Sequence, residues 1–157
     1  MAAVGQLIRL ATSADAGVVA HHRAAMFHDM GLVPATAVPA LEAASRVYLQ
    51  AALARGDYVG WVVEHEGRVI AGGGALLRRL LPRPEHPEGG EEAYLLNVYT
   101  EPEHRRHGVA RRLMEVILEW CRARQINRVS LHASDDGRPL YESLGFAQTN
   151  EMRVELR

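Results

Sequence analysis

A short basic segment, Arg105-Arg-His-Gly-Val-Ala110, holds the residues of this chain best suited to binding an anion. It follows a β-rich run and precedes a long amphipathic helical pattern, so it lies where that helix begins. At a helix N-terminus the first backbone N–H groups lack partners, and the helix dipole adds roughly half a positive charge. Gly108 would let phosphate oxygens approach the backbone, while Arg105, Arg106 and Arg111 add charge. The segment therefore predicts a diphosphate site.

Two well-known classes of phosphate loop do not fit this segment. A P-loop NTPase needs a lysine before its helix, and all 18 basic residues of this chain are arginine. A dinucleotide-binding fold needs a G-x-G-x-x-G turn, and the turn before this helix is not rich in glycine. The predicted diphosphate site at 105–110, called the anion cradle below, thus belongs to neither of these classes.

The elements that must position this cradle follow from changes in the hydrophobic period. Helices are expected at about 12–30, 39–55, 109–124 and 139–144, and strands at 7–10, 58–64, 68–77, 93–99, 129–132 and 152–156. The step from strand 93–99 through a helix to strand 129–132 is a βαβ unit, which makes those two strands parallel. We predict an α/β fold with a central mixed, mostly antiparallel sheet and helices on both of its faces.

The helical periods also predict which side chains are buried. For the long helix the expected stripe is Leu113, Val116, Ile117 and Trp120. The second helix is expected to bury Leu41, Ala44, Tyr48 and Ala52, and the first Val18, Val19, His22, Ala25, Met26 and Met30. A capping box at Thr12 and Asp15 starts the first helix. A tight turn at Glu66-Gly67 joins two strands.

Bulk properties narrow the class of protein. Residues 1–157 are expected to form one domain, with a net charge of −1 that attracts neither nucleic acid nor an anionic membrane. No apolar run is long enough to span a bilayer, and Met1–Leu10 does not resemble a secretion signal. The single Cys121 excludes an internal disulfide and is assigned to packing. These features predict a cytoplasmic location.

Two motifs together resemble the GNAT superfamily of N-acetyltransferases. R-x-x-G-x-A at Arg105–Ala110 is similar to its pyrophosphate-binding motif, and Leu140-Tyr-Glu-Ser-Leu-Gly-Phe146 is similar to its L-Y-x-x-x-G-F element. The expected order of elements matches this family from Leu7 to Leu156. The resemblance implies that acetyl-CoA is the cosubstrate and that it lies where strand 93–99 splays from strand 129–132.

The resemblance also assigns the cofactor site residue by residue. The residues expected to contact acetyl-CoA are Asn97, Val98, Tyr99, Arg105, Arg106, His107, Gly108, Val109, Ala110, Arg111 and Ser134. Ser134 stands where many family members have an asparagine, which reduces its expected role. Backbone groups of 97–99 would pair with the pantetheine arm as an added strand does.

The implied reaction joins a neutral amine to a thioester carbonyl by direct attack. Tyr141 is the expected general acid, because a phenol with a pKa of about 10 is protonated at neutral pH. The N–H of Val98 or Tyr99 is expected to meet the oxyanion. The base stays open among Glu92, Glu64, His65 and a water relay, and Glu92 is the residue we select.

The acceptor is expected to be a small primary amine. The acidic loop 82–92, with Glu85, Glu88, Glu91 and Glu92, predicts a cationic one. A protein or peptide N-acetyltransferase and a non-catalytic acyl-CoA sensor remain alternatives, and a homodimer stays open. A nucleic-acid role is not favoured, because acidic residues dilute the arginines and no aromatic platform accompanies them. No metal site is expected, because the adjacent His21 and His22 point in different directions.

Overall fold

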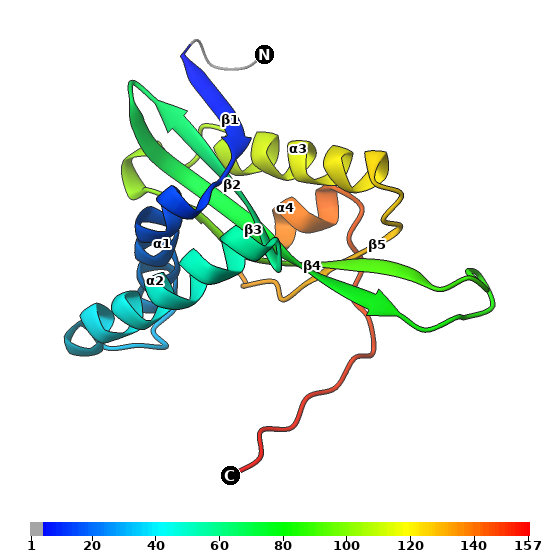
Figure 1. Cartoon of the computed structure of the whole chain (residues 1–157). Coiled ribbons are helices and arrows are strands. Elements are labelled where there is room, and N and C mark those ends of the chain that lie inside the picture. The colour runs from blue at the N-terminus through cyan, green and yellow to red at the C-terminus, as the bar shows by residue number, and fades with distance from the viewer. Residues whose placement is uncertain (1–4) are drawn as a thin grey trace.

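The computed structural model describes residues 5–157 and contains a five-stranded sheet (Figure 1). The strands lie in chain order and are β1 (Gln6–Leu10), β2 (Tyr58–His65), β3 (Arg68–Leu80), β4 (Gly90–Thr100) and β5 (Arg128–Leu131). Neighbours from β1 to β4 pair antiparallel, and β4 pairs with β5 in parallel. The predicted mixed, mostly antiparallel sheet is therefore confirmed.

Four α-helices flank the sheet on its two faces (Figure 1). They are α1 (Ala16–Asp29), α2 (Val38–Arg55), α3 (Val109–Ala123) and α4 (Arg138–Ser143). Three short 3₁₀ turns accompany them at η1 (Ser13–Asp15), η2 (Ala35–Ala37) and η3 (Pro102–His104). The first two helices pack on one face, and α3 packs on the other. Within residues 5–157 no helix is both long and apolar enough to cross a membrane.

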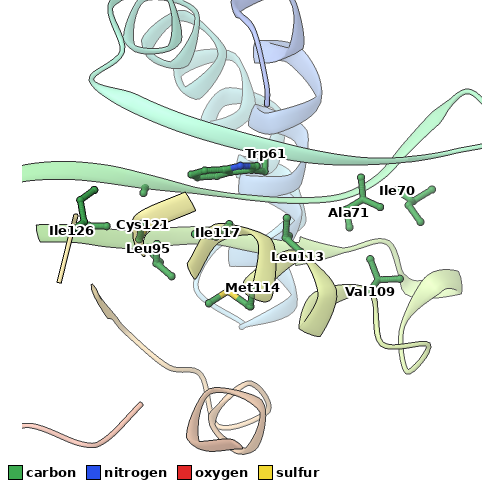
Figure 2. Close-up of a cluster of buried hydrophobic side chains, with 13 residues drawn as sticks. Trp61, Ile70, Ala71, Leu95, Val109, Leu113, Met114, Ile117, Cys121 and Ile126 are labelled. Atoms are coloured by element: carbon green, nitrogen blue, oxygen red, sulfur yellow. The ribbon is translucent and has the colours of Figure 1, made fainter. Parts of the chain in front are cut away.

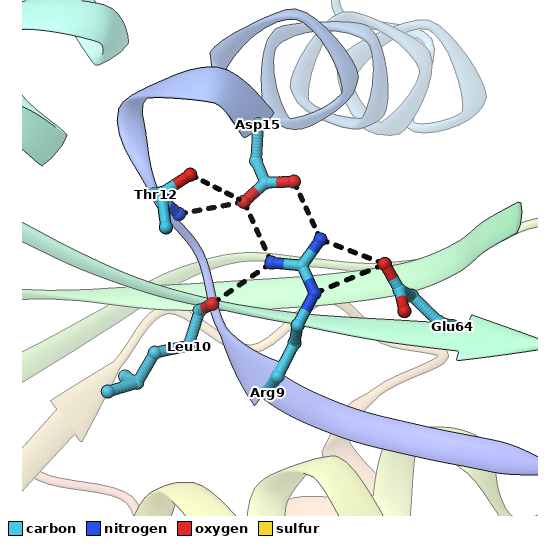
Figure 3. A network of polar contacts seen from close by, with 5 residues as sticks. All are labelled: Arg9, Leu10, Thr12, Asp15 and Glu64. Carbon is cyan, nitrogen blue, oxygen red and sulfur yellow. Dashed lines mark hydrogen bonds and ion pairs between the residues drawn. The ribbon is translucent and has the colours of Figure 1, made fainter. Parts of the chain in front are cut away.

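Local sequence signals account for one tight turn and for the start of one helical segment. Glu66 and Gly67 both take positive φ values, 50° and 75°, as a tight β-hairpin turn requires. At the start of the first helical segment, the Thr12 N–H donates a hydrogen bond to the Asp15 carboxylate at 2.7 Å. Arg9 bridges Asp15 and Glu64, which ties β1 and β2 to that helix start (Figure 3). The Arg9 guanidinium lowers the pKa of Asp15.

The face of the sheet under α3 holds an apolar core (Figure 2). The helix buries Leu113, Met114, Ile117 and Cys121, and Trp120 packs edge-on against Trp61. The expected stripe was wrong at Val116, which is exposed. The line 113–117–121 faces the sheet, and residue 116 lies about 100° around the helix axis from residue 117.

The opposite face of the sheet buries alanines of α1 and α2 together with the larger Leu49, Tyr58 and Val62. Ala20, Ala24 and Ala52 are fully buried, and helices with alanines at their contacts can pack closely. The expected burial of Ala44, Tyr48 and Met30 was wrong, because all three are exposed. The buried line of α2 runs through Ser45, Leu49 and Ala52, about one residue around the helix axis from the expected face, and Met30 lies at the C-cap beyond α1.

Two expectations about the second half of the chain were also wrong. No strand forms at 152–156, because no strand of the described chain pairs with that segment. The structure moves Glu91 and Glu92 from the acidic loop into β4, where register pairs them with Arg79 and Arg78. The loop is therefore shorter, at 81–89, because β-pairing continues to the Leu80–Gly90 pair.

Candidate active site

The N-terminus of α3 has the backbone geometry of an anion cradle. Gly108 is the N-cap residue and has φ 75°, and Arg106 two residues earlier has φ 62°. Left-handed residues in such a turn direct successive N–H groups into one concavity. The first intrahelical bond of this turn runs from the Arg112 N–H to the Gly108 carbonyl at 3.1 Å. The N–H groups of Val109, Ala110 and Arg111 therefore precede the helical ladder.

The arginines around the cradle have different partners. Arg105 donates to the Thr100 carbonyl at 2.8 Å and to Asp29 at 2.7 Å, and the Asp29 carboxylate raises its pKa. Arg111 donates to the Ser143 hydroxyl at 2.7 Å, which links α3 to α4. Arg106 is exposed at the rim, as is His107. The structure thus turns Arg105 toward α1 and Arg111 toward α4, and leaves Arg106 exposed in the turn before the helix.

Arg112 has a positioning role that the sequence analysis missed. Its guanidinium donates to the His107 carbonyl at 3.1 Å and to the Gln6 side chain of β1. These bonds hold the loop just before Gly108 and connect it to the far edge of the sheet. The signal was available, because an arginine four residues after Gly108 lies directly above it on a helix.

The two parallel strands separate next to this cradle. Pairing between β4 and β5 runs from Glu92–Arg128 to Leu95–Leu131 and ends there. β4 continues to Thr100, and on that side no strand of the described chain pairs with residues 96–100. This open edge contains Asn97, Val98 and Tyr99. An extended ligand can pair with such an edge as an added strand does, and the pairing of 97–99 with the pantetheine arm stays a prediction.

A β-bulge lies within the open edge. Leu96 pairs with Gly74 and Tyr99 with Gly72, so Asn97 and Val98 both lie opposite Gly73. Asn97 takes φ 60°, a conformation that asparagine tolerates better than most residues. The bulge turns Val98 toward the α3 core while Asn97 turns toward α1.

The Asn97 side chain joins a buried polar network. Its oxygen accepts a hydrogen bond from Arg23 of α1 at 2.7 Å, and its amide donates to the Tyr58 hydroxyl at 3.2 Å. Burial raises the pKa of Tyr58 to about 12, so this phenol stays protonated. A Cβ on Gly74 would lie 2.0 Å from the Tyr58 hydroxyl, so glycine is required there.

The sequence analysis assigned no role to this network, although one signal for it was present. Three consecutive glycines, Gly72 to Gly74, stand inside a β-rich run. Glycine within a strand marks a bulge or a close approach of other groups. Here it marks both, because Tyr58 packs over Gly74 and the bulge of β4 lies opposite Gly73.

Tyr141 lies on α4, half-buried against Phe146 with ring centroids 5.9 Å apart. Burial raises its pKa, which keeps the phenol protonated at neutral pH. Burial is the cause of this shift, and no hydrogen bond from a described side chain contributes to it. Ser134 accepts a bond from the Gly137 N–H at 3.1 Å and so shapes the turn that leads into α4.

The candidate bases lie in different environments. Glu92 is half-buried on β4, 3.2 Å from Arg78 and 2.9 Å from the Ser130 hydroxyl, three residues before the strands separate. Glu64 is held by Arg9 at 2.9 Å, and His65 lies next to the β2–β3 turn. β3 separates Glu64 from the open edge of β4, whereas the His65 ring lies 5.8 Å from that of His104, in the turn that follows β4.

A second group of titratable residues lines the α1 side of β4. His22 is buried, its ring centroid is 5.1 Å from that of Tyr99, and its Nε2 lies 3.4 Å from the Glu101 carboxylate. Burial, with a smaller contribution from His21, lowers the pKa of His22 to about 4. His21 is exposed, 3.5 Å from both Glu42 and Glu101. Among the described residues no group of three or more His, Cys, Asp or Glu side chains has a metal-binding arrangement.

Comparisons with known proteins agree with this geometry. The family model of the acetyltransferase (GNAT) family matches residues 25–146. A crystal structure of a GCN5-related N-acetyltransferase from Ralstonia eutropha JMP134 is 35% identical, with a TM-score of 0.87, over 97% of this chain and 99% of that one. A predicted acetyltransferase from Clostridium acetobutylicum, solved with acetyl-CoA, is 27% identical, with a TM-score of 0.83, over 97% and 96%.

A similarity to a named human enzyme covers less of the chain. N-acetyltransferase 8 from Homo sapiens is 29% identical over 94 residues, which are 58% of this chain. The match spans only 39% of that protein's length. It therefore supports the class of protein and not the substrate.

Proposed function

The chain belongs to the acetyltransferase (GNAT) family, and on that premise we propose that it transfers an acetyl group from acetyl-CoA to a primary amine. One observation carries the proposal. An anion cradle at the start of α3 directly follows the open edge of β4, so a diphosphate and an extended arm would meet adjoining backbone groups. Members of this family use acetyl-CoA, which combines those two parts.

The cradle fits the pyrophosphate of this cosubstrate. Gly108 presents no side chain, and its left-handed conformation turns the following amides outward. A Cβ there would meet only the Arg112 guanidinium, at 3.2 Å, so the space in front of the cradle stays open. Arg106 and Arg111 supply positive charge beside it. Bound acetyl-CoA would supply an activated acyl carbon at the separation of the two strands.

The residues of the chain supply the remaining chemistry. The N–H of Val98 or Tyr99, on the bulged edge, would stabilise negative charge that develops on the carbonyl oxygen. Tyr141 would donate a proton to the leaving sulfur, and its raised pKa keeps that proton in place at neutral pH. Glu92 would take the proton from the ammonium, directly or through water. Its half-buried position beside Ser130 supports this role.

The acceptor is proposed to be a small amine. The α1 side of β4 presents the carboxylates of Glu42 and Glu101 around His21, and such carboxylates attract an ammonium group. A peptide N-terminus is the alternative outcome of the test.

Two further parts of the proposal concern the chain as a whole. We propose that residues 1–157 act as one acetyltransferase domain, because the sheet and its two core clusters involve elements from β1 to α4. We also propose a cytoplasmic location, since the single cysteine is buried and forms no disulfide.

A panel of amines with acetyl-CoA and free-thiol detection tests the proposal. Amino acids, polyamines, aminoglycosides and peptides with free N-termini are compared with a reaction that lacks acceptor. Cys121 is buried, so the thiol reagent reads released CoA with little background from the protein. Turnover of a small amine above the acceptor-free rate supports the proposal. Acetyl-CoA binding without turnover of any amine would instead indicate a sensor.

A further inference from the structure

Arg23 of α1 lies beside the bulge of β4, on the face of the sheet opposite α3. Its Nη1 donates a 2.7 Å hydrogen bond to the Asn97 side chain, and its guanidinium lies over the Phe27 ring, 4.7 Å from the centroid. Phe27 is four residues further along the same helix, so both side chains leave α1 on one face. A hydrogen bond and a cation–π contact together hold this long side chain in place.

The group that holds Arg23 is itself fixed by the core. Asn97 is 4% exposed, and its amide donates to the hydroxyl of Tyr58, which is buried and packs over Gly74. The network therefore runs from a helix through the bulge of one strand to a second strand. A cation held in this way loses little further side-chain freedom when it binds a ligand.

The charge of Arg23 is not balanced by its partner, because the Asn97 amide is neutral. Arg9, Arg78 and Arg105 each form an ion pair with a carboxylate, at 2.9, 3.2 and 2.7 Å. Within residues 5–157 the half-buried Arg23 forms no ion pair of this kind. Partial burial of a charge costs free energy unless an opposite charge offsets it, and a bound anion would supply that charge.

The orientation of the guanidinium fits an oxyanion. The bond to Asn97 is made by Nη1, whereas Nε and Nη2 form the other edge of the group. Two parallel N–H bonds point outward from that edge. They match the two oxygens of a carboxylate, or two oxygens of a phosphate, in a bidentate pair.

The position of Arg23 relates it to the acceptor. Pairing of β4 with β5 ends at Leu95, and Asn97 is two residues further along the open edge. The α3 face of the sheet is filled here by core side chains, Val98 among them, whereas the Asn97 side chain points toward α1. An acceptor therefore approaches the open edge from the α1 side, where Arg23 lies.

We propose that the acceptor is a primary amine that also carries an oxyanion, and that Arg23 binds this oxyanion. The inference rests on the proposed acetyl transfer and narrows the class of its acceptor. The same side of the sheet presents the carboxylates of Glu42 and Glu101, which attract the ammonium group. An acceptor with one charge of each sign complements both features.

Matched pairs of acceptors test the proposal. Several α-amino acids are compared with their amides, and phosphoethanolamine is compared with ethanolamine, at saturating acetyl-CoA. In the wild type, kcat/KM should favour the anionic member of one pair by about ten- to a hundredfold, as expected for hydrogen bonds between charged groups. In Arg23→Gln this ratio should fall at least about fivefold. Comparing the ratio between two proteins cancels the different basicities of an amino acid and its amide. The pair that responds distinguishes a carboxylate from a phosphate.

Three controls separate recognition from structure. Glutamine at position 23 can still donate to Asn97, and the KM of acetyl-CoA should stay unchanged in this variant. Arg46→Gln removes the same charge from an exposed position on α2 and should keep the wild-type ratio. Arg23→Lys keeps the charge without the bidentate edge and should keep part of the ratio. If Arg23→Gln slows both members of a pair equally, Arg23 has a structural role only, and the proposal is overturned.

A binding measurement distinguishes this inference from acetyl transfer itself. The same compounds are titrated calorimetrically into the protein with CoA present. Binding that needs both the oxyanion and Arg23, without turnover, supports the oxyanion site and overturns acetyl transfer. Turnover that favours the neutral members, or that treats both members alike, overturns the oxyanion site and leaves acetyl transfer standing. If no anionic compound is preferred in binding or in turnover, the oxyanion site is also overturned.

Discussion

On the α3 side of the sheet the large buried cluster is apolar throughout, whereas the α1–α2 side buries the polar residues His22, Ser45 and Asn97. The features proposed for the cofactor lie toward α3 and are mostly backbone groups: the first amides of a helix and one edge of a strand. The features proposed for the acceptor are side chains of α1, of α2 and of Glu101, the residue directly after β4. A site made of backbone groups requires only the right local conformation of the chain. A site made of side chains requires residues that are far apart in the sequence to come close together in the fold.

This difference predicts that a single change at the cradle abolishes cosubstrate binding. Gly108→Glu adds a negative charge at the anion site and a side chain at φ 75°. Acetyl-CoA at 100 times its Kd should stabilise the wild type by about 2.7 kcal/mol, measured by thermal melting, and should not stabilise the variant.

Gly108→Asn is the matched control for that experiment. Asparagine tolerates the left-handed conformation and carries no charge but still adds a side chain where phosphate must approach, so this variant should lose less of the ligand-induced shift than Gly108→Glu does. Glu42→Gln, on the α1–α2 side, should leave the shift unchanged. A folded Gly108→Glu protein that is still stabilised by acetyl-CoA would remove the cradle from the binding site.

The next largest effect is expected for Tyr141→Phe, which tests the chemical step separately from acetyl-CoA binding. Tyr141→Phe removes one hydroxyl and keeps the packing against Phe146. The value of kcat should fall roughly ten- to a thousand-fold, as expected for loss of a general acid, while acetyl-CoA affinity stays within a few-fold. Steady-state kinetics and a thermal shift measure the two quantities. An unchanged kcat would mean that Tyr141 only packs.

The same contrast explains how much could be predicted from the sequence. The turn and helix start at 105–110 were predicted, because R-x-x-G-x-A before an amphipathic helix is a local signal, and diphosphate binding there stays a prediction. The order of elements along the chain was predicted through β5, because period and turn residues are local too. The network of Arg23, Asn97 and Tyr58 was not, since its bonds join residues 74 and 39 positions apart.

The wrong predictions concern which way an element faces and what it pairs with. On α2 the expected face was off by about one residue, since Ser45, Leu49 and Ala52 are buried while Tyr48 is exposed. Residues 152–156 have the pattern of a strand, but a strand also needs a neighbour, and the pattern does not say on which chain that neighbour lies. Local sequence therefore predicts an element's type better than its partner.

The pH dependence of stability tests the buried polar residues on the α1–α2 side of the sheet. The buried His22 has its pKa lowered to about 4, against 6.5 in an unfolded chain, so the folded state favours the neutral ring. Glu101 is 3.4 Å away but makes no hydrogen bond to this ring, so burial dominates. As the pH falls from 6.5 toward 4, the unfolded state gains a proton that the folded state does not. The free energy of unfolding should drop by up to about 3 kcal/mol over this window.

Urea unfolding at several pH values between 4 and 7 measures this slope, and His22→Gln supplies the comparison. Glutamine stays neutral throughout, so the variant should lose most of the slope while its stability near pH 7 changes less. The Asp15 carboxyl, with its lowered pKa, acts only at lower pH and is separated from this window. An equal slope in both proteins would assign the effect to other groups.

The smallest expected effect concerns the acidic loop, which belongs to neither face. The structure leaves only Glu85 and Glu88 on loop 81–89, because Glu91 and Glu92 lie on β4 near Arg124 and Arg78. Charges on an exposed loop are screened over about 8 Å in physiological salt. Glu85→Gln/Glu88→Gln should therefore raise the KM of a cationic amine by less than about twofold and leave the KM of acetyl-CoA unchanged. Glu42→Gln, beside His21 on the proposed acceptor side, should raise the KM of the amine by more than the loop variant does. If the loop variant has the larger effect, the amine approaches past the loop, and the α1–α2 side would lose its proposed role in acceptor binding.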